Sequence, residues 1–460
     1  MPLSSVFSTR RSVLKAAIAL GPLAIVRAAE FRATDFGAKG DGKTVDTEAI
    51  QRAIDGAAKS NGVVTFRPGV YRSGALFLRS GMRLQIDEGV TIRGVQDLLA
   101  YPEMPTRVAG VEMTWPAALI NVYRQANVSI SGKGKIDGDG KFWWDRYWRL
   151  RKEYEPKGLR WAADYDCKPV RLIQIYKSSH VNLRELRLER SGFWTVHVCY
   201  SQHVHVDGMT IRNNIDGRGP STDGIDIDSS ANVLVERCDI DCNDDALCLK
   251  AGRDADGLRV NRPTENVVVR DCTIRGGAAG VTAGSETSGG IRNVRVSGLR
   301  VLAGVPYGIY LKSAKTRGGT VENIEISNLK LQGVATPIGV TMNWNPSYSY
   351  AQLPPGMKQV PDYWKVLTEP VPPSKGLPHF RNIRISEVDA KEAKRAFQVS
   401  AFPGDPLEHF SFDRLTIQAR SAGTIADAEN WTFHRTEIAT EDGSHVSLRN
   451  CRNIKGLPES

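Results

Sequence analysis

The sequence has little of what marks metal-binding or disulfide-stapled proteins. It holds seven cysteines in 460 residues. None of them forms a Cys-x-x-Cys pair, which argues against a zinc site of the usual spacing. Their odd number argues against a fully paired disulfide framework. We therefore expect free thiols that serve packing, including Cys242 and Cys248, and no bound metal or cofactor.

Three further absences narrow the class of protein. No apolar run reaches the length of about 20 residues that a membrane-spanning helix needs. Despite the net charge of +10, the chain has no compact Lys/Arg cluster and no recognisable nucleic-acid-binding motif, so neither a membrane nor a nucleic acid is an expected partner of the mature protein. No helical pattern of 10 to 15 residues separates the strand-like segments, which argues against alternating strand and helix layers.

The pattern of the N-terminal residues predicts an export signal. Arg10-Arg11 and Lys15 precede an apolar run over 16–26, and Ala28 and Ala29 follow as at a signal-peptidase site. The paired arginines resemble a twin-arginine signal, and the alternative is an ordinary secretory signal with a chance Arg-Arg pair. We expect residues 1–28 to be a removed signal peptide and the protein to be periplasmic or extracellular.

An internal repeat dominates the rest of the chain. A short unit, Asn or His followed by alternating β-formers, recurs at intervals of about 30 residues. Its copies begin at Asn127, His180, His203, Asn232, Asn266, Asn293, Asn323, Asn382, His409 and His445. Alternation with period two predicts strands with one inward and one outward face, and Gly/Asn/Asp clusters predict turns between them. The pattern predicts an all-β fold, a single right-handed parallel β-helix.

We expect residues 29–460 to form this one domain. A solenoid needs covers at its ends. The amphipathic segment 47–58, with Asp46 as N-cap, predicts a helix that covers the N-terminal end. A proline-rich stretch near 345–378 interrupts the repeat and predicts a long loop beside the β-helix, of a length that is often functional.

Four consecutive coils contain segments that can be aligned by their apolar alternation. If Ile225, Leu247, Val281 and Ile309 stack inward, Asp223 and Asp245 occupy equivalent positions on adjacent coils, about 4.8 Å apart. Asp244 precedes Asp245, and Lys312 lies two coils further on. The alignment therefore predicts three carboxylates crowded on one outer face, with a cation nearby.

Crowded carboxylates repel one another, which raises the pKa of at least one of them. One protonated and one ionised carboxyl group are what glycosidic hydrolysis requires. Two alternatives remain on the residues alone. Asp244-Asp245 could be turn residues, or the carboxylates could bind Ca²⁺, as in a calcium-dependent lyase. Asp226 and Asp228 could be solvated outward residues of a strand.

The motifs resemble those of glycoside hydrolase family 28, the polygalacturonases and rhamnogalacturonases. The resemblance covers nearly the whole mature chain. It rests on Thr34 to Gly42, on Ile136 to Gly140 with Trp143-Trp144, and most specifically on Ser221 to Asp226, Asn243-Asp244-Asp245, Gly284-Ser285-Glu286 and Ser288-Gly289-Gly290. It implies inverting hydrolysis of O-glycosidic bonds in an acidic plant cell-wall polysaccharide or its oligosaccharides.

The resemblance also implies residue roles. Asp244 would protonate the leaving group, and Asp223 and Asp245 would activate water. Lys312 matches the family's lysine that contacts the substrate carboxylate, and we expect Tyr310 and Asp226 to contact substrate as well. Three positions depart from the family pattern.

Ser221 replaces Asn in the Asn-Thr-Asp motif, and Ala278 stands in place of the histidine of the Gly-His-Gly motif. Tyr310 stands in place of the arginine of the Arg-x-Lys motif. Two carboxylate-contacting groups are thus absent while the aspartates remain. This pattern implies a changed subsite, with a rhamnogalacturonan backbone as plausible a substrate as polygalacturonan.

Aromatic residues at the start of the proline-rich loop, Trp344, Tyr348 and Tyr350, are candidates to line sugar subsites, whereas Trp143, Trp144 and Trp148 are expected to pack. A non-catalytic carbohydrate-binding β-helix is the remaining alternative to an enzyme. We expect a monomer.

Overall fold

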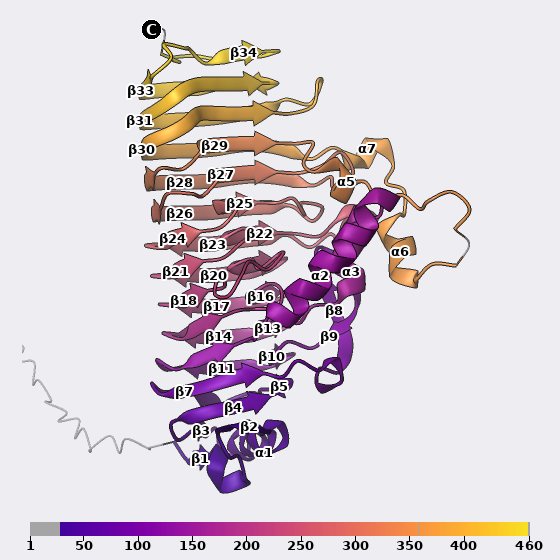
Figure 1. Ribbon diagram of the computed structural model, residues 1–460. Coiled ribbons are helices and arrows are strands. Elements are labelled where there is room, and N and C mark those ends of the chain that lie inside the picture. Colours follow the sequence, from indigo (N-terminus) through magenta and orange to yellow (C-terminus); the bar gives the residue numbers. More distant parts are fainter. Residues whose placement is uncertain (1–27, 358, 459–460) are drawn as a thin grey trace, which may run out of the picture.

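The computed structural model describes residues 28–357 and 359–458. Apart from one antiparallel hairpin, its described strands wind into one right-handed parallel β-helix, which confirms the predicted fold class (Figure 1). One coil illustrates the path: β19 (Ile225–Asp228), β20 (Ala231–Glu236) and β21 (Asp239–Asp241) lie on three successive faces, and β22 (Leu247–Lys250) then stacks on β19. We call these faces the β19, β20 and β21 faces.

Strands of the same face pair in parallel from coil to coil. The β19 face also contains β5 (Leu76–Phe77), β10 (Ile120–Tyr123), β13 (Ile173–Tyr176), β16 (Val196–Cys199), β25 (Ala279–Ala283), β27 (Tyr307–Lys312), β29 (Thr336–Thr341) and β34 (Ser447–Arg449). The β21 face contains β2 (Asp41–Val45), β4 (Gly69–Ser73), β7 (Val90–Gly94), β12 (Lys135–Asp137), β15 (Arg187–Glu189), β18 (Thr210–Arg212) and β24 (Thr273–Gly276).

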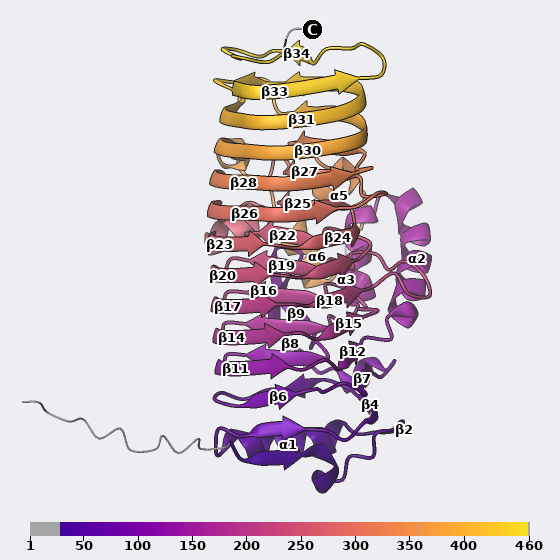
Figure 2. The same cartoon turned by 90° about the vertical axis from the view of Figure 1, so that its left-hand side faces the viewer.

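The β20 face is the longest column (Figure 2). It contains β1 (Glu30–Arg32), β3 (Val63–Thr65), β6 (Arg83–Gln85), β11 (Ala126–Ser131), β14 (Ser179–Arg184), β17 (Gln202–Asp207), β23 (Thr264–Arg270), β26 (Ile291–Val301), β28 (Thr320–Gln332), β30 (His379–Ser400), β31 (Leu407–Ala426), β32 (Ala428–Glu429) and β33 (Thr432–Thr440). From β26 onward the strands are long enough to continue around a corner: β30 pairs with β28 and also with β29 of the β19 face.

The sequence repeat corresponds to the start of each β20-face strand. Val204, Val233, Val267 and Val294 pair in register and are buried, so each coil adds one layer to a continuous apolar core. The Asn or His that precedes each of these valines has a φ near +55°. Asn tolerates this left-handed conformation better than most residues, which explains why it recurs there.

One predicted copy of the repeat, His445, is wrong. The segment after it forms β34, which pairs with Thr424–Ala426 on the β19 face. The equivalent position on the last coil is Asn430, with a φ of +58°, because Thr432 pairs with Ser411. A matching four-residue pattern therefore placed the strand on the wrong face of the coil.

Helix α1 (Thr47–Ala58) covers the N-terminal end of the core, as predicted (Figure 2). Its apolar stripe, which includes Ile50 and Ile54, is fully buried. Asp46 stands at the N-cap position, but its carboxylate accepts hydrogen bonds from the Lys39 and Gly40 amides at 2.7 and 3.0 Å instead of capping the helix. The preceding 3-10 turn is η1 (Ala33–Phe36).

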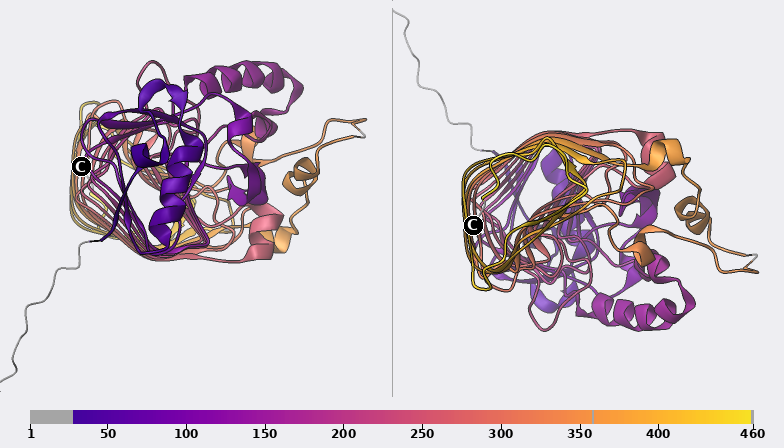
Figure 3. Two further views of the ribbon diagram at one scale, coloured as in Figure 1. Left: turned by 90° about the horizontal axis from the view of Figure 1, so that it is seen from below. Right: turned by 90° about the horizontal axis from the view of Figure 1, so that it is seen from above.

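All the longer insertions lie on one side of the solenoid, beside the β19 face (Figure 3). They comprise η2 (Leu98–Ala100) with the antiparallel hairpin β8 (Glu103–Val108) and β9 (Val111–Pro116); α2 (Lys141–Tyr154), η3 (Glu155–Lys157), η4 (Arg160–Ala162) and α3 (Ala163–Cys167); α4 (Asp254–Val260); and α5 (Pro346–Ser349), α6 (Asp362–Leu367) and α7 (Pro373–Gly376). The last three lie in the proline-rich stretch expected near 345–378. The insertions form walls over this face.

The 14-residue helix α2 contradicts the expectation that no helix of such length separates the strands. Its apolar positions are mostly aromatic and are interspersed with many charged residues, and only Trp143, Trp144 and Tyr147 are buried. The exclusion of a layered α/β fold nevertheless stands, because α2 connects β12 on the β21 face to β13 on the β19 face and does not cross over a sheet.

The predicted export signal, residues 1–28, lies outside the described residues apart from Ala28. Within the described part of the chain, no helix has the length and apolar character of a bilayer span. All seven cysteines are free thiols, and six of them are buried, in keeping with a packing role.

Candidate active site

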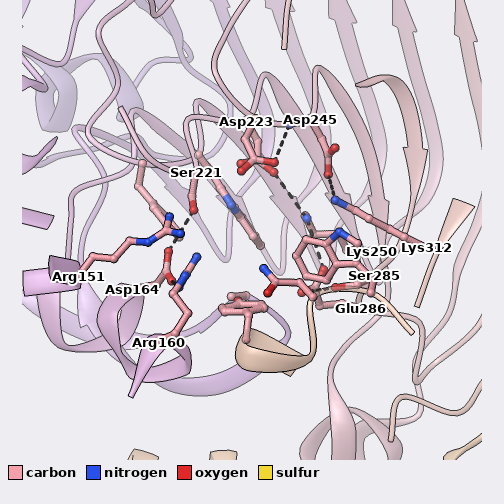
Figure 4. Close-up of a pocket in the computed structure, with 17 residues that line it drawn as sticks. Arg151, Arg160, Asp164, Ser221, Asp223, Asp245, Lys250, Ser285, Glu286 and Lys312 are labelled. Carbon is pink, nitrogen blue, oxygen red and sulfur yellow. Dashed lines mark hydrogen bonds and ion pairs between the residues drawn. The ribbon is translucent and has the colours of Figure 1, made fainter. Parts of the chain in front are cut away.

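A cavity of about 220 Å³ lies between the β19 face and the walls formed by the insertions (Figure 4). Four of the six predicted site residues line it: Asp223, Asp244, Asp245 and Lys312. The other lining residues are Ala109, Arg151, Arg160, Asp164, Phe193, Trp194, Ser221, Lys250, Ser285, Glu286, Trp344, Asn345 and Tyr348. The cavity is therefore rich in both carboxylates and cations.

The register of the β19 face brings the aspartates together as the alignment predicted. Ile225 pairs with Leu247, Leu247 with Val281, and Val281 with Ile309. Just before these strands, the Gly224 amide donates to the Asp245 carbonyl at 2.9 Å. A Cβ at Gly224 would lie 2.3 Å from the Ala246 carbonyl oxygen, so only glycine permits the close approach of the two coils at this point.

The partners of Asp245 favour its ionised form. Lys312 Nζ lies 2.8 Å from Asp245 Oδ2, and Thr282 Oγ1 donates to Asp245 Oδ1 at 2.9 Å. Burial by itself would raise the pKa of this carboxyl group, but the ammonium groups of Lys312 and Lys250 outweigh it and hold the pKa below its usual value. A carboxylate of this kind can accept a proton from water.

Asp223 occupies the equivalent position on the previous coil and has weaker partners. Lys250 Nζ lies 3.6 Å from Asp223 Oδ2, and Asp223 Oδ1 has no hydrogen-bond partner in the part of the chain that the structure describes. Burial, together with the charges of Asp226 and Asp244, raises its pKa well above the usual value. Its carboxylate oxygen lies within 4.8 Å of that of Asp245, so one small molecule such as water can contact both.

Asp244 lies beside this pair and is partly exposed to the cavity. Its Oδ1 accepts a hydrogen bond from the Asp245 amide at 2.9 Å, which orients the carboxyl group. Burial and the neighbouring charge of Asp245 raise its pKa. A carboxyl group that keeps its proton and reaches solvent can act as a general acid.

Sequence reasoning gave no site role to five charged residues that line the cavity: Arg151, Arg160, Asp164, Lys250 and Glu286. Lys250 Nζ lies 3.4 Å from Glu286 Oε2 and 4.8 Å from the centre of the Trp194 ring. The cations around Glu286, Lys250 first among them, overcome its burial and lower its pKa to about 2. A signal was present for Lys250, which closes the aligned segment that begins at Asp244 and stands two residues after outward-facing Cys248.

Asp226 and Asp228 are not solvated, contrary to one interpretation of the sequence; both are completely buried. Asp228 accepts a hydrogen bond from Arg107 at 3.0 Å and lies 3.5 Å from His197, and these partners hold its pKa below the usual value despite burial. Among the described residues, neither oxygen of Asp226 has a partner with hydrogen-bond geometry, and burial raises the pKa of this carboxyl group well above the usual value. Asp226 lies beneath the cavity, 3.6 Å from Lys250, and does not line it.

Tyr310 does not line the cavity either. Its ring stacks on that of Tyr307 with 3.9 Å between the centroids. Ala278 lies directly beside the acid candidate, since its amide donates to the Asp244 carbonyl at 2.9 Å. The two positions that depart from the expected motifs thus carry no charge toward the aspartates.

Of the aromatic candidates, Trp344 and Tyr348 line the cavity and Tyr350 does not. Trp344 lies against the cation that holds Asp245, with Lys312 Nζ 4.4 Å from its ring centre. Trp143 and Trp144 are buried as expected, but Trp148 is 40% exposed.

The donor set does not favour calcium. The oxygens of Asp223 and Asp245 and the sulfur of Cys248 lie within 4.8 Å of one another, but Ca²⁺ prefers an all-oxygen shell. Two ammonium groups, Lys250 and Lys312, already face these aspartates where a cation would have to bind.

Comparison with known proteins agrees with this geometry. The model of glycosyl hydrolases family 28 matches residues 73–358, and that of rhamnogalacturonase A/epimerase, pectate lyase-like, matches residues 31–91. The chain is 28% identical over 394 residues to a "Probable polygalacturonase" of Vitis vinifera, covering 83% of this chain and 73% of that protein. It is 30% identical over 312 residues to an endo-polygalacturonase of Pectobacterium carotovorum, covering 65% and 72%.

Among solved structures, an exopolygalacturonase from Thermotoga maritima shares the fold. The TM-score is 0.72 at 24% identity, over 93% of this chain and 92% of that one. The family model spans more than half of the chain and includes every aspartate of the cavity. The protein is thus a member of glycosyl hydrolase family 28.

Proposed function

We propose that the protein hydrolyses glycosidic bonds of pectic polysaccharide or its oligosaccharides by an inverting mechanism, with Asp244, Asp223 and Asp245 as the catalytic residues. The observation that carries the proposal is the division of ionisation within one cavity. Asp244 is biased toward its protonated form and Asp245 toward its ionised form. This division is the pairing of acid and base that glycoside hydrolysis uses.

In this mechanism Asp244 donates its proton to the leaving glycosidic oxygen. Asp245, with Asp223 at its side, holds and deprotonates the attacking water. Lys312 keeps Asp245 ionised and contributes positive charge near the substrate. Asp226 and Tyr310 support this arrangement from beneath and beside the cavity, and a direct contact of either with substrate would require a rearrangement.

The substrate class follows from membership of the family and from the polygalacturonases among the curated relatives. The mildly basic chain suits an acidic polymer, because opposite charge speeds encounter. An exported protein would meet such a polymer outside the cell, which agrees with the predicted signal in residues 1–28. Neither the calcium-dependent lyase nor the binding-only alternative accounts for two lysines placed against a carboxylate triad.

The test is release of reducing ends by the protein lacking residues 1–28, in chelator, from polygalacturonan and rhamnogalacturonan side by side. We expect activity on at least one polymer and none from Asp244→Asn. NMR of the first product should show the inverted anomer. Retained activity in Asp244→Asn, or loss of activity on adding chelator, would contradict the proposal. The preferred polymer decides whether Ala278 and Tyr310 mark a changed subsite.

A further inference from the structure

The cavity has a second charged wall that no family motif contains. In Figure 4, Arg151, Arg160, Asp164 and Ser221 lie on one side of Asp223, and the lysines with Glu286 lie on the other. The two arginines and Asp164 belong to the insertion between β12 and β13, on α2, η4 and α3. This insertion therefore contributes its own recognition surface, which we call the α2 wall.

Arg160 is a largely buried cation at the edge of the cavity. Its side chain is 12% exposed, and Nη1 donates to Asp164 Oδ2 at 2.8 Å. Its guanidinium lies 5.1 Å from the centre of the Tyr348 ring, and its Nε has no hydrogen-bond partner among residues 28–357 and 359–458. The opposite oxygen of Asp164 accepts from Ser221 Oγ at 3.0 Å, which ties the α2 wall to the loop that leads into Asp223.

Arg151 is the more accessible cation of the pair. Its only ion pair within the described chain is with Glu155, four residues along the helix, where Nε donates at 2.8 Å to a carboxylate that is 48% exposed. Such a surface pair contributes little and exchanges readily. The guanidinium lies 5.5 Å from the ring centre of Trp148, which keeps it near the helix surface at the mouth of the cavity.

The two sides of the cavity differ in charge balance. On the lysine side, both cations already have carboxylate partners: Lys312 lies against Asp245, and Lys250 lies against Asp223, Asp226 and Glu286. On the α2 wall, two guanidinium groups and one carboxylate, Asp164, line the cavity, and Glu155, the half-exposed partner of Arg151, lies outside the lining. An anionic group of a ligand is therefore more stable on the α2 side of the aspartates than on the lysine side.

We propose that Arg151 and Arg160 bind the carboxylate of a uronic acid unit on the α2 side of the aspartates. The proposal rests on the proposed function, since it names how that site recognises its substrate. Planar guanidinium groups match a carboxylate in geometry and hydrogen-bond it strongly. The α2 wall thus provides charge recognition in a cavity where Ala278 and Tyr310 provide none.

The test compares a pectic oligosaccharide bearing free carboxylates with the same oligosaccharide after methyl esterification. Arg151→Gln and Arg160→Gln should each lower kcat/KM on the free acid by about 10- to 100-fold, mainly through KM, and change it little on the ester. Arg149→Gln is the matched control, because Arg149 is exposed on the same helix and does not line the cavity. Arg160→Lys, with the thermal midpoint of unfolding, separates lost recognition from lost folding.

Equal losses on acid and ester, or no loss in Arg151→Gln, would overturn the proposal. Binding measured by calorimetry in the Asp244→Asn background makes the result independent of turnover. If the wild type hydrolyses neither polymer but Arg151→Gln still weakens binding of the free acid selectively, the proposed function fails and this inference stands. If hydrolysis is confirmed but substitution of either arginine leaves binding of the free acid unchanged, the proposed function stands and this inference fails.

Discussion

Asp223 and Asp245 occupy the same position on neighbouring coils, yet their environments push their pKa values in opposite directions. Asp245 has a lysine at 2.8 Å and a threonine hydroxyl at 2.9 Å, whereas Asp223 has a lysine at 3.6 Å and one oxygen without a partner. Both are almost completely buried. A repeating scaffold can therefore place identical residues in register and still shift their pKa values in opposite directions, through the side chains that other coils supply.

A second pair on strand β19 shows the same principle. Asp226 and Asp228 are two residues apart and equally buried, but only Asp228 has an arginine and a histidine as partners. The pKa of Asp228 is lowered and that of Asp226 is raised. The partners, not the burial, decide which buried carboxylate stays charged.

The largest losses of activity are expected when Asp245 or Asp223 is substituted. Asp245→Asn should lower kcat by about 10²- to 10⁴-fold and also destabilise the fold by about 3–5 kcal/mol, because it leaves Lys312 buried without its carboxylate. Asp223→Asn should lower kcat within the same range but cost less stability, because Asp223 is biased toward the neutral form. Kinetics and denaturant unfolding of both variants check this. Equal losses of stability would contradict the contrast.

Removing the Lys312 ammonium group should shift the pKa of Asp245 in the same direction as that of Asp223. In Lys312→Met the pKa of Asp245 should rise, so the acidic limb of the kcat/KM profile should move to higher pH. Thr282→Ser, which keeps the hydroxyl group, serves as the control and should leave the limb in place. An unmoved acidic limb in Lys312→Met would mean that Asp245 is not the base whose ionisation the profile reports.

The pH dependence of the stability of the fold should distinguish the role of Asp226 from that of Asp228. A carboxyl group with a raised folded pKa stabilises the fold below its unfolded pKa, and this stabilisation is lost as pH rises through the folded pKa. Asp226→Asn should therefore gain on the order of 1–3 kcal/mol relative to wild type at neutral and alkaline pH. Asp228→Asn should lose stability above an unfolded pKa of about 3.9, with the loss shrinking as pH falls. The check is the thermal midpoint of unfolding of both variants and the wild type from pH 3 to 9. If both substitutions shift the midpoint in the same direction at neutral pH, the distinction is wrong.

The smallest expected effect concerns the contribution of the Thr282 hydroxyl group to the pKa of Asp245 and to the stability of the fold. Thr282→Val removes one hydrogen bond to Asp245 and keeps the side-chain shape, which should cost about 0.5–1.5 kcal/mol of stability. The acidic limb of the kcat/KM profile should move to higher pH by less than in Lys312→Met, because the nearby ammonium group remains. A shift as large as that of Lys312→Met would assign the control of Asp245 to the hydroxyl group instead of the cation.

The β-helix, its N-terminal helix and the grouping of Asp223, Asp244, Asp245 and Lys312 could all be predicted from the sequence. Period-two alternation and the spacing of one coil are local properties, and in a solenoid each strand contacts its neighbours in the stack, so aligning repeats is enough to align residues in space. The same locality explains the error at His445, where a matching pattern of four residues belonged to another face.

The rest of the site depends on the tertiary structure. The α2 wall belongs to an insertion that folds back over the β19 face from outside the repeat, and the ion pairs of Lys250 with Asp223, Asp226 and Glu286 join side chains of different coils. No period in the sequence specifies where such insertions come to rest. The pKa values follow from distances of 2.8 against 3.6 Å between charged atoms, and differences of this size arise from packing across several coils and are not encoded by residue type.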